Sequence, residues 1–280
     1  MTPTFDLDGK SAVVVTRHGK EKLIEPALAG LGLRFLPKPL VDTDQYGTFT
    51  RKIGRAASQR NAVLAKAQAG LDLVPDADFA LASEGAFGPH PHIPFVPSGL
   101  EMIALLERKS GKAVIGRHLT IATNFMHTVA RSWVDVEAFA GRIGLAGQAM
   151  LVMESRHGPV LATEPIDEDV LKTVCESGIE TSGSVWLEAD MRADMNPARM
   201  DAIAAAAADL VRRLEARCPR CHHPDWTARL RSGRPCACCS GPTIEAFVEE
   251  YFCEHCGHFD ERPIDPERKG EPAQCTYCNP

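Results

Sequence analysis

The sequence contains no apolar run that approaches the roughly 20 residues a helix needs to cross a bilayer. Residues 1–8 also lack the basic and apolar regions of a secretory signal. We therefore expect a cytoplasmic protein that has no membrane partner.

An excess of positive charge is missing as well. The chain carries 31 Lys and Arg residues against 37 Asp and Glu residues, which gives a formal net charge of −6. Binding of nucleic acid requires clustered cations that displace counterions from the phosphate backbone. The composition therefore argues against DNA or RNA as a partner.

Cysteine, by contrast, is concentrated near the end of the chain. Eight of the ten Cys residues form four Cys-x-x-Cys pairs: Cys218/Cys221, Cys236/Cys239, Cys253/Cys256 and Cys275/Cys278. Thiol clusters in a chain without an export signal indicate metal binding rather than disulfides. Thiolate sulfur suits zinc, and four Cys ligands leave no open coordination position, so we expect structural sites.

The spacing of the pairs predicts how they combine. Fourteen residues separate the first pair from the second, and eighteen separate the third from the fourth. Each interval lets two neighbouring pairs meet around one tetrahedral ion. We therefore predict two Zn²⁺ ions in consecutive zinc ribbons. Of the two remaining cysteines, Cys175 fits a protein core. Cys238 lies between proposed ligands, where we expect a spectator, and exchange with a neighbouring ligand is the alternative.

Residues 1–217 alternate strand-like and helix-like segments. The β-branched run 11–16 is typical of a buried strand, and 21–31 follows it with one apolar helical face. A second buried strand is expected at 78–83. The order predicts an α/β fold with a mixed sheet, flanking helices and a central cleft, followed by a double zinc ribbon at 218–280. Such sheets bind ligands at loops beyond the carboxyl ends of their strands.

The loop after the first strand is one candidate site. It contains Thr16, Arg17, His18, Gly19 and Lys20 between a strand and the start of a helix. Backbone N–H groups and cations at such a turn can hold a phosphate. The sequence lacks a full P-loop pattern, so an ordinary turn with solvated cations is the alternative.

A second candidate follows the strand at 78–83. There Ser83, Glu84 and Gly85 place a carboxylate at the tip of the strand, next to a glycine that lets a ligand approach the backbone. Glu84 can ligate Mg²⁺ or act as a general base, with Asp78 or Asp44 as a further metal ligand. A carboxylate that caps its own loop is the alternative.

A third candidate is the polar segment 188–199, which follows a strand and opens a helix. Arg192 in this segment could contact a phosphate. Its acidic and basic side chains could equally pair with each other.

Residues 11–90 resemble the inosine/xanthosine triphosphate pyrophosphatase superfamily. The resemblance rests on Thr16 to Lys20, on Gly47-Thr48-Phe49, on Asn61 to Ala67 and on Ser83-Glu84-Gly85, in the order of that family's motifs. It implies a metal-assisted hydrolase in which Lys20, Lys66 and Glu84 are catalytic and Thr48 contacts phosphate. Arg60 stands where the family has a glutamate that belongs to its metal shell.

The whole chain also resembles a bacterial family of unknown activity that ends in Cys-x-x-Cys-Asn-Pro. We therefore expect hydrolysis of a nucleotide or another phosphorylated small molecule, assisted by Mg²⁺ or Mn²⁺. The alternative is a non-catalytic protein that binds a small anion and docks a protein partner through its ribbons. The sequence leaves a homodimer open.

Overall fold

The computed structural model describes residues 5–16, 19–39, 58–144, 150–163 and 167–279. The chain divides into two compact units. One comprises Leu7–Val211, and the other comprises Met1–Asp6 with Arg212–Pro280. The prediction from the sequence divided the chain after residue 217.

The larger unit contains a five-stranded mixed sheet with the order β2-β1-β3-β4-β5. Its strands are β1 (Ser11–Val15), β2 (Arg34–Phe35), β3 (Phe79–Pro89), β4 (Pro97–Glu107) and β5 (Ala113–Thr120). β1 runs parallel to β2 and β3, whereas β3, β4 and β5 are antiparallel. The predicted mixed α/β fold is confirmed.

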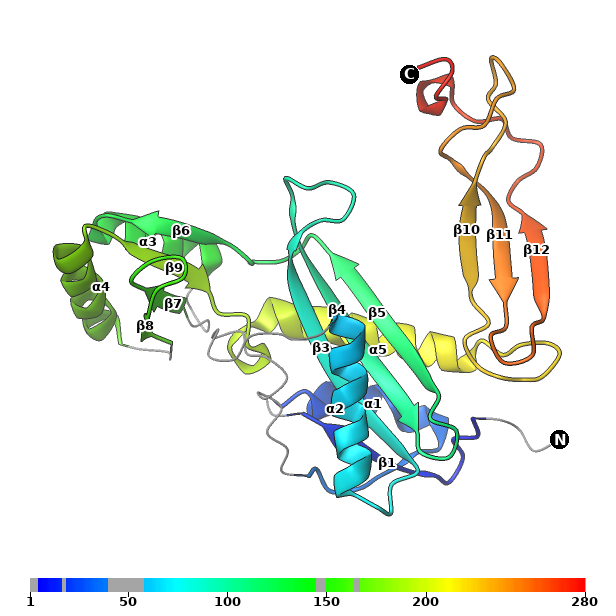
Figure 1. Ribbon diagram of the computed structural model, residues 1–280, viewed down its shortest axis with the longest axis horizontal. Coiled ribbons are helices and arrows are strands. Elements are labelled where there is room, and N and C mark those ends of the chain that lie inside the picture. The colour runs from blue at the N-terminus through cyan, green and yellow to red at the C-terminus, as the bar shows by residue number, and fades with distance from the viewer. Residues whose placement is uncertain (1–4, 17–18, 40–57, 145–149, 164–166, 280) are drawn as a thin grey trace. The chain divides into compact units, whose positions relative to one another are not determined.

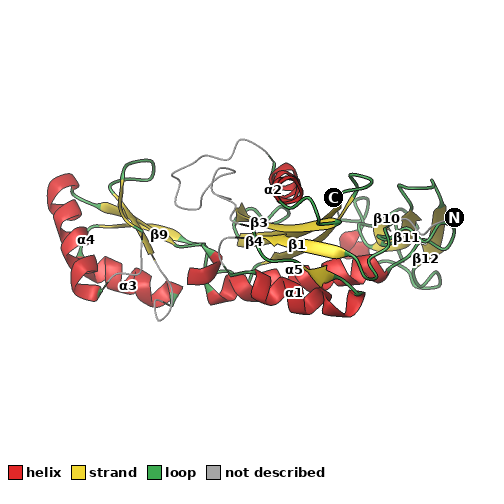
Figure 2. Ribbon diagram, turned by 90° about the horizontal axis from the view of Figure 1, so that it is seen from below, coloured by secondary structure: helices red, strands yellow, loops and turns green. Residues whose placement is uncertain are grey.

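Helices cover both faces of this sheet, as Figure 2 shows. They are α1 (Glu21–Leu28, followed by the 3₁₀ turn Ala29–Leu31), α2 (Gln59–Leu73) and α5 (Pro197–Glu215). α2 packs its apolar side chains onto Val13, Val15, Ala80 and Ala82, which share one face because strand side chains alternate. The opposite face meets α5 so closely that a Cβ on Gly116 of β5 would lie 2.4 Å from the carbonyl oxygen of Ala206.

A second, antiparallel sheet of the same unit has the order β6-β9-β7-β8. Its strands are β6 (His127–Ala130), β7 (Met150–Met153), β8 (Val160–Ala162) and β9 (Val185–Ala189). Its helices are α3 (Trp133–Ile143) and α4 (Glu168–Ser182), and the 3₁₀ turn Ala193–Met195 precedes α5. Phe139, Leu171 and the predicted core residue Cys175 are buried together with this sheet.

The smaller unit is built around an antiparallel sheet with the order β10-β11-β12 (Figure 1). Its strands are β10 (Ala228–Ser232), β11 (Ala246–Phe252) and β12 (Phe259–Pro263), and the 3₁₀ turn Pro272–Gln274 lies near the end of the chain. All eight paired cysteines flank these strands. Over the described residues of both units, no helix has the length and apolar character that crossing a membrane would require.

One element differs clearly from the prediction. The strand expected at 78–83 continues as β3 to Pro89, through Gly85 and Gly88. Its partner β4 pairs with it along the whole length, so ladder hydrogen bonds outweigh the chain-breaking tendency of these glycines. As a result, Glu84 lies inside a strand rather than in a loop.

Candidate functional site

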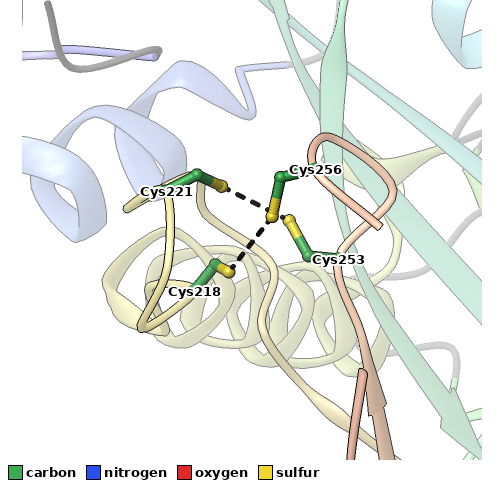
Figure 3. A group of neighbouring side chains, drawn as sticks. All are labelled: Cys218, Cys221, Cys253 and Cys256. Carbon is green, nitrogen blue, oxygen red and sulfur yellow. Dashed lines mark hydrogen bonds between the residues drawn. The ribbon is translucent and has the colours of Figure 1, made fainter. Parts of the chain in front are cut away.

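The eight paired cysteines form two four-cysteine clusters, each of which can hold a metal ion. Cluster 1 contains Cys218, Cys221, Cys253 and Cys256 (Figure 3), and cluster 2 contains Cys236, Cys239, Cys275 and Cys278. In each cluster the sulfur atoms all lie within 4.8 Å of one another.

The sulfur–sulfur distances fit a tetrahedral ion. They are 3.8 Å for Cys218–Cys256 and 3.6 Å for Cys221–Cys253 in cluster 1. In cluster 2 they are 3.9 Å for Cys236–Cys278 and 3.5 Å for Cys239–Cys275. A zinc–sulfur bond of about 2.3 Å places tetrahedral ligands about 3.8 Å apart, whereas a disulfide needs about 2.05 Å.

The prediction of consecutive sites was wrong, because the four pairs alternate between the two clusters. The strands explain the alternation. β10 separates the first pair from the second, β11 the second from the third, and β12 the third from the fourth. Since neighbouring strands are antiparallel, successive pairs lie at opposite ends of the sheet. The first pair therefore meets the third, and the second meets the fourth.

Backbone N–H groups favour the thiolate form of one ligand in each cluster. Burial raises the pKa of Cys218, but hydrogen bonds from the backbone of Cys221 and Arg220, together with those from the thiols of Cys253 and Cys221, lower that pKa to about 7. Hydrogen bonds from the backbone of Cys278 and Tyr277 lower the pKa of Cys275 to about 7 in the same way. Thiolate is the form that binds metal.

The surroundings of the two clusters differ. Beside cluster 1, the Trp226 ring stacks on Tyr251 at 5.4 Å and on His258 at 5.1 Å, and it packs against Cys218 and Cys253. In cluster 2, Cys239 and Cys278 are exposed. The predicted spectator Cys238 is exposed as well, and it lies outside both ligand sets.

A buried arginine organises the loops that lead to cluster 2. Arg234 is 1% exposed and donates hydrogen bonds to four backbone carbonyl oxygens, those of Ala246, Ile264, Asp265 and Arg268. Its guanidinium also lies 5.5 Å from the centre of the Phe247 ring. A planar cation with five donors can satisfy several carbonyls at once, which an apolar core residue cannot.

In the larger unit, charged side chains gather beside the carboxyl end of β1. β1 pairs with β3 only as far as Val15 and Ala82, and β3 then continues past it. Lys66 on α2 lies 2.5 Å from the Glu84 carboxylate, and Lys20 lies 3.0 Å from the Ser83 hydroxyl. Two lysines that are distant in the sequence are thus brought to two neighbouring residues of β3.

Strand alternation places these contacts on opposite faces of β3. Glu84 shares the face of Ala82 and α2, so its carboxylate meets Lys66. Ser83 and Gly85 point to the other face. There Glu101 of β4 forms an ion pair of 2.7 Å with Arg199 of α5.

This second ion pair packs tightly against Gly85. A Cβ on Gly85 would lie 2.4 Å from the Glu101 carboxylate and 2.6 Å from the Arg199 guanidinium. Glycine is therefore required at this position to leave room for the pair, and both Glu101 and Arg199 are almost fully buried. Arg199 also donates to the backbone oxygen of Met191. We call Lys20, Lys66, Glu84, Glu101 and Arg199 the charged cluster.

The charged cluster changes the ionisation of Lys20. Burial is the largest cause, and the cations Arg199 and Lys66 add to it, so that the pKa of Lys20 is lowered from 10.5 to about 7. Glu101 and Glu84 act in the opposite direction but do not compensate. Lys20 is therefore close to half protonated at neutral pH.

Thr16 and Gly19 lie close to Lys20 in the sequence, between the end of β1 and the start of α1. The hydroxyl oxygen of Thr16 is buried, and it has no hydrogen-bond partner among the described residues. Gly19 adopts a φ of +68°, a conformation that favours glycine, at the turn into α1. Gln59 at the start of α2 donates to the backbone oxygens of Glu84 and Leu100, at 2.9 and 2.7 Å.

Other predicted residues lie elsewhere or outside the description. Asp78 precedes β3, about 20 Å along the strand from Glu84. There it accepts hydrogen bonds from the backbone and side chain of Ser11, which lower its pKa. Arg192 pairs with Asp190 at 2.7 Å. Arg17, His18, Asp44 and Thr48 lie outside the described residues.

Sequence reasoning did not single out Glu101, although a signal for it exists. Glu101 lies two and four residues before the buried Ile103 and Leu105 in β4. Because strand side chains have a period of two, this spacing would have placed the Glu101 carboxylate on the same buried face. A carboxylate buried there requires a cation, and Arg199 supplies it. Arg199 closes the polar segment 188–199, but its partner is 98 residues away in the sequence.

Residues 66–280 match the family described as Domain of unknown function (DUF6671). The chain belongs to this family. No curated protein matches the chain. The resemblance to nucleotide pyrophosphatases therefore stays a prediction from short motifs. The matched region includes Lys66, the later residues of the charged cluster and both four-cysteine clusters, but the description of the family names no activity.

Proposed function

We propose that the Leu7–Val211 unit binds a phosphorylated small molecule beside the end of β1 and hydrolyses it with the help of Mg²⁺ or Mn²⁺. The observation that carries the proposal is the charged cluster. Lys66 pairs there with Glu84, while Lys20 contacts the neighbouring Ser83 on the other face of β3, which also carries the Glu101–Arg199 ion pair. The buried hydroxyl of Thr16 lies at the end of the neighbouring strand. The predicted cleft and the nucleotide substrate remain parts of this proposal.

Each residue has a role that follows from its chemistry. Lys20 would hold a phosphate oxygen, and Lys66 would stabilise negative charge on the leaving phosphate. Glu84, oriented by Lys66, would contact the metal ion or a water molecule. Mg²⁺ commonly binds through one or two carboxylates together with substrate phosphates, so a single glutamate is a sufficient protein ligand.

In the smaller unit, we propose that each four-cysteine cluster holds one structural Zn²⁺. The sulfur–sulfur distances support a tetrahedral tetrathiolate site. Metal analysis of the purified chain should give two zinc ions per chain, and a count near zero would refute this part of the proposal.

Activity is tested with a panel of nucleoside triphosphates and phosphate esters in the presence of Mg²⁺ or Mn²⁺. Glu84→Gln and Lys20→Met should each abolish the release of phosphate or pyrophosphate. Lys22→Met is the matched control, because Lys22 lies two residues after Lys20, in the first turn of α1, and is exposed. The absence of turnover with every substrate would refute the hydrolase.

The lowered pKa of Lys20 makes a binding prediction. Bound phosphate would raise this pKa again, so binding of inorganic pyrophosphate above pH 7 should take up close to one proton. Affinity should then fall by up to about tenfold per pH unit as the pH rises above 7. Calorimetry in two buffers that differ in ionisation enthalpy measures the proton uptake, and Lys20→Met should remove it.

The non-catalytic alternative is favoured by the Lys66–Glu84 contact. Glu84 is only 3% exposed, and its carboxylate is already engaged by Lys66, as in a structural ion pair. In that case the cluster would hold a small anion without turnover, and the metal-binding unit would contact a protein partner. Thermal stabilisation by pyrophosphate without product release would identify this function.

A further inference from the structure

An amine and a hydroxyl meet on the face of β3 that lies opposite α2. The side-chain nitrogen of Lys20 lies 3.0 Å from the hydroxyl oxygen of Ser83, and both residues are almost fully buried. Within the described parts of the chain, Lys20 forms no ion pair, and its amine has no second hydrogen-bond partner. A buried lysine that serves only as a structural cation is normally paired with a carboxylate, as Lys66 is with Glu84. The contact of Lys20 with a neutral hydroxyl therefore differs from the ion pairs around it.

A second hydroxyl lies beside Ser83. β1 pairs with β3 in parallel up to Val15 and Ala82, so continuing this register by one residue places Thr16 next to Ser83, on the same face. The hydroxyl oxygen of Thr16 is buried, and no described residue is within hydrogen-bonding reach of it. Because buried hydroxyls are normally hydrogen-bonded, this unpaired one beside a serine and a lysine indicates a group that a ligand completes.

We propose that Ser83 is a nucleophile activated by Lys20, and that hydrolysis of the phosphorylated substrate passes through a phosphorylated Ser83. The activated serine follows from the geometry of this face, and only the phosphorylated substrate rests on the proposed function. A serine hydroxyl needs an adjacent base to become nucleophilic, and lysine is the base in Ser–Lys pairs. With a pKa lowered to about 7, Lys20 is close to half neutral at neutral pH, and a neutral amine accepts the hydroxyl proton across the same 3.0 Å.

The reaction balances in two steps. In the first, neutral Lys20 takes the Ser83 proton while the Ser83 oxygen bonds to phosphorus. The bond between phosphorus and the leaving oxygen breaks, and the leaving oxygen takes up the proton from Lys20. In the second, water attacks phosphorus and gives a proton to Lys20, which passes it to the Ser83 oxygen as the bond from that oxygen to phosphorus breaks. Between these transfers the Lys20 ammonium group and the Thr16 hydroxyl stabilise the negative charge of the phosphoryl oxygens.

The test uses the full chain and diisopropyl fluorophosphate, a small reagent that reacts with activated serine hydroxyls. The Ser83 oxygen bonds to phosphorus, fluoride leaves with the electron pair of the phosphorus–fluorine bond, and Lys20 takes up the hydroxyl proton. Mass spectrometry of the intact chain should show one added diisopropylphosphoryl group. Tandem mass spectrometry of the tryptic peptide 67–108 should locate this group on Ser83 and not on Ser98.

Three variants and a pH profile test the roles of the two residues. Ser83→Ala should abolish the labelling, and Lys20→Met should slow it by about 100-fold or more, as expected for loss of a general base. Ser98→Ala is the matched control, because Ser98 is also buried but its hydroxyl contacts the backbone oxygen of Gly88 instead of an amine, so this variant should be labelled at the wild-type rate. In the wild-type chain the labelling rate should rise with pH through about 7 and then level off, since only the neutral amine accepts the proton.

The outcomes separate this inference from the proposed function. A folded wild-type chain that is not labelled on Ser83 at any pH would overturn the inference, and so would equal labelling rates in wild type and Lys20→Met. Labelling of Ser83 in a chain that hydrolyses none of the phosphorylated substrates would support the activated serine and overturn the proposed function. Hydrolysis of a phosphorylated substrate that persists in Ser83→Ala would overturn the inference and leave the proposed function intact.

Discussion

Replacing Glu101 by Gln tests how strongly the buried charges of the larger unit depend on one another. Glu101 is fully buried, and its carboxylate is held 2.7 Å from the guanidinium of Arg199, which is 3% exposed. The amide keeps the size of the side chain but removes the charge. The cation of Arg199 then stays buried without the charge of Glu101, while its bond to the Met191 oxygen remains.

The expected cost is about 3–5 kcal/mol of unfolding free energy, the range for removing one partner of a buried ion pair. The double variant Glu101→Leu with Arg199→Met removes both charges at similar volume. It should recover most of that loss, because apolar replacement of a whole buried pair is often neutral. Urea denaturation followed by circular dichroism measures both values.

The pH dependence of stability that Lys20 causes is an independent test of the charged cluster. Since its pKa is lowered to about 7, the unfolded chain binds more protons than the folded chain between pH 7 and 10. Stability should therefore rise with pH in this window. Among the charged groups, Arg199 lowers the pKa of Lys20 most, and Glu101 opposes it. The double variant removes both charges, so it should flatten the rise of stability with pH only slightly. Lys20→Met removes the titrating group and should abolish the rise.

Two results would refute this reasoning. A loss below about 1 kcal/mol for Glu101→Gln would mean that water reaches Arg199 and screens its charge. A double variant as unstable as the single one would mean that the cost comes from packing around Gly85 rather than from the loss of the Glu101 charge beside Arg199.

Three further predictions concern other parts of the chain. Cys221→Ser combined with Cys253→Ser alters one cluster and should lose one zinc ion per chain, whereas Cys221→Ser combined with Cys236→Ser alters both clusters and should lose two. Equal zinc counts in the two double variants would contradict the alternating clusters. Gly116→Ala should cost at least about 1–3 kcal/mol in thermal unfolding, since its Cβ would meet the backbone of α5, and an unchanged melting temperature would show that the helix can shift. Arg234→Met should leave four carbonyls without their donor and lower the chelator concentration that strips cluster 2, while cluster 1 keeps its metal.

The regular elements of the core could be predicted from local patterns. The run of valines in β1 and the apolar face of α1 identify a strand and a helix because burial imposes those periods. The Cys-x-x-Cys pairs likewise identify metal ligands, because each pair places two thiol ligands within four consecutive residues. Lys20, Lys66 and Glu84 were selected from short motifs; the structure pairs Lys66 with Glu84 and places Lys20 against the neighbouring Ser83, on the other face of β3.

Pairings across long stretches of chain could not be predicted in the same way. Nothing in the spacing of the cysteines says that a strand lies between each two pairs, yet those strands decide which pairs meet. Glu101 and Arg199 are a similar case, since the alternation in β4 indicates that Glu101 is buried, but nothing in the sequence identifies Arg199, 98 residues later, as its partner. The long β3 also depended on its partner, because pairing with β4 extended it through two glycines.

The charges of the cluster restrict what can bind there. Counted over the described residues, Lys20, Lys66 and Arg199 supply three cations, and Glu84 and Glu101 supply two carboxylates, so the fully ionised cluster carries one positive charge in excess. Loss of the Lys20 proton near pH 7 removes this excess. A phosphate anion would remove it without loss of that proton. A divalent cation alone would add two further positive charges to a buried cation-rich place, which is electrostatically unfavourable. Any Mg²⁺ at this position must therefore arrive together with the phosphate groups that it neutralises.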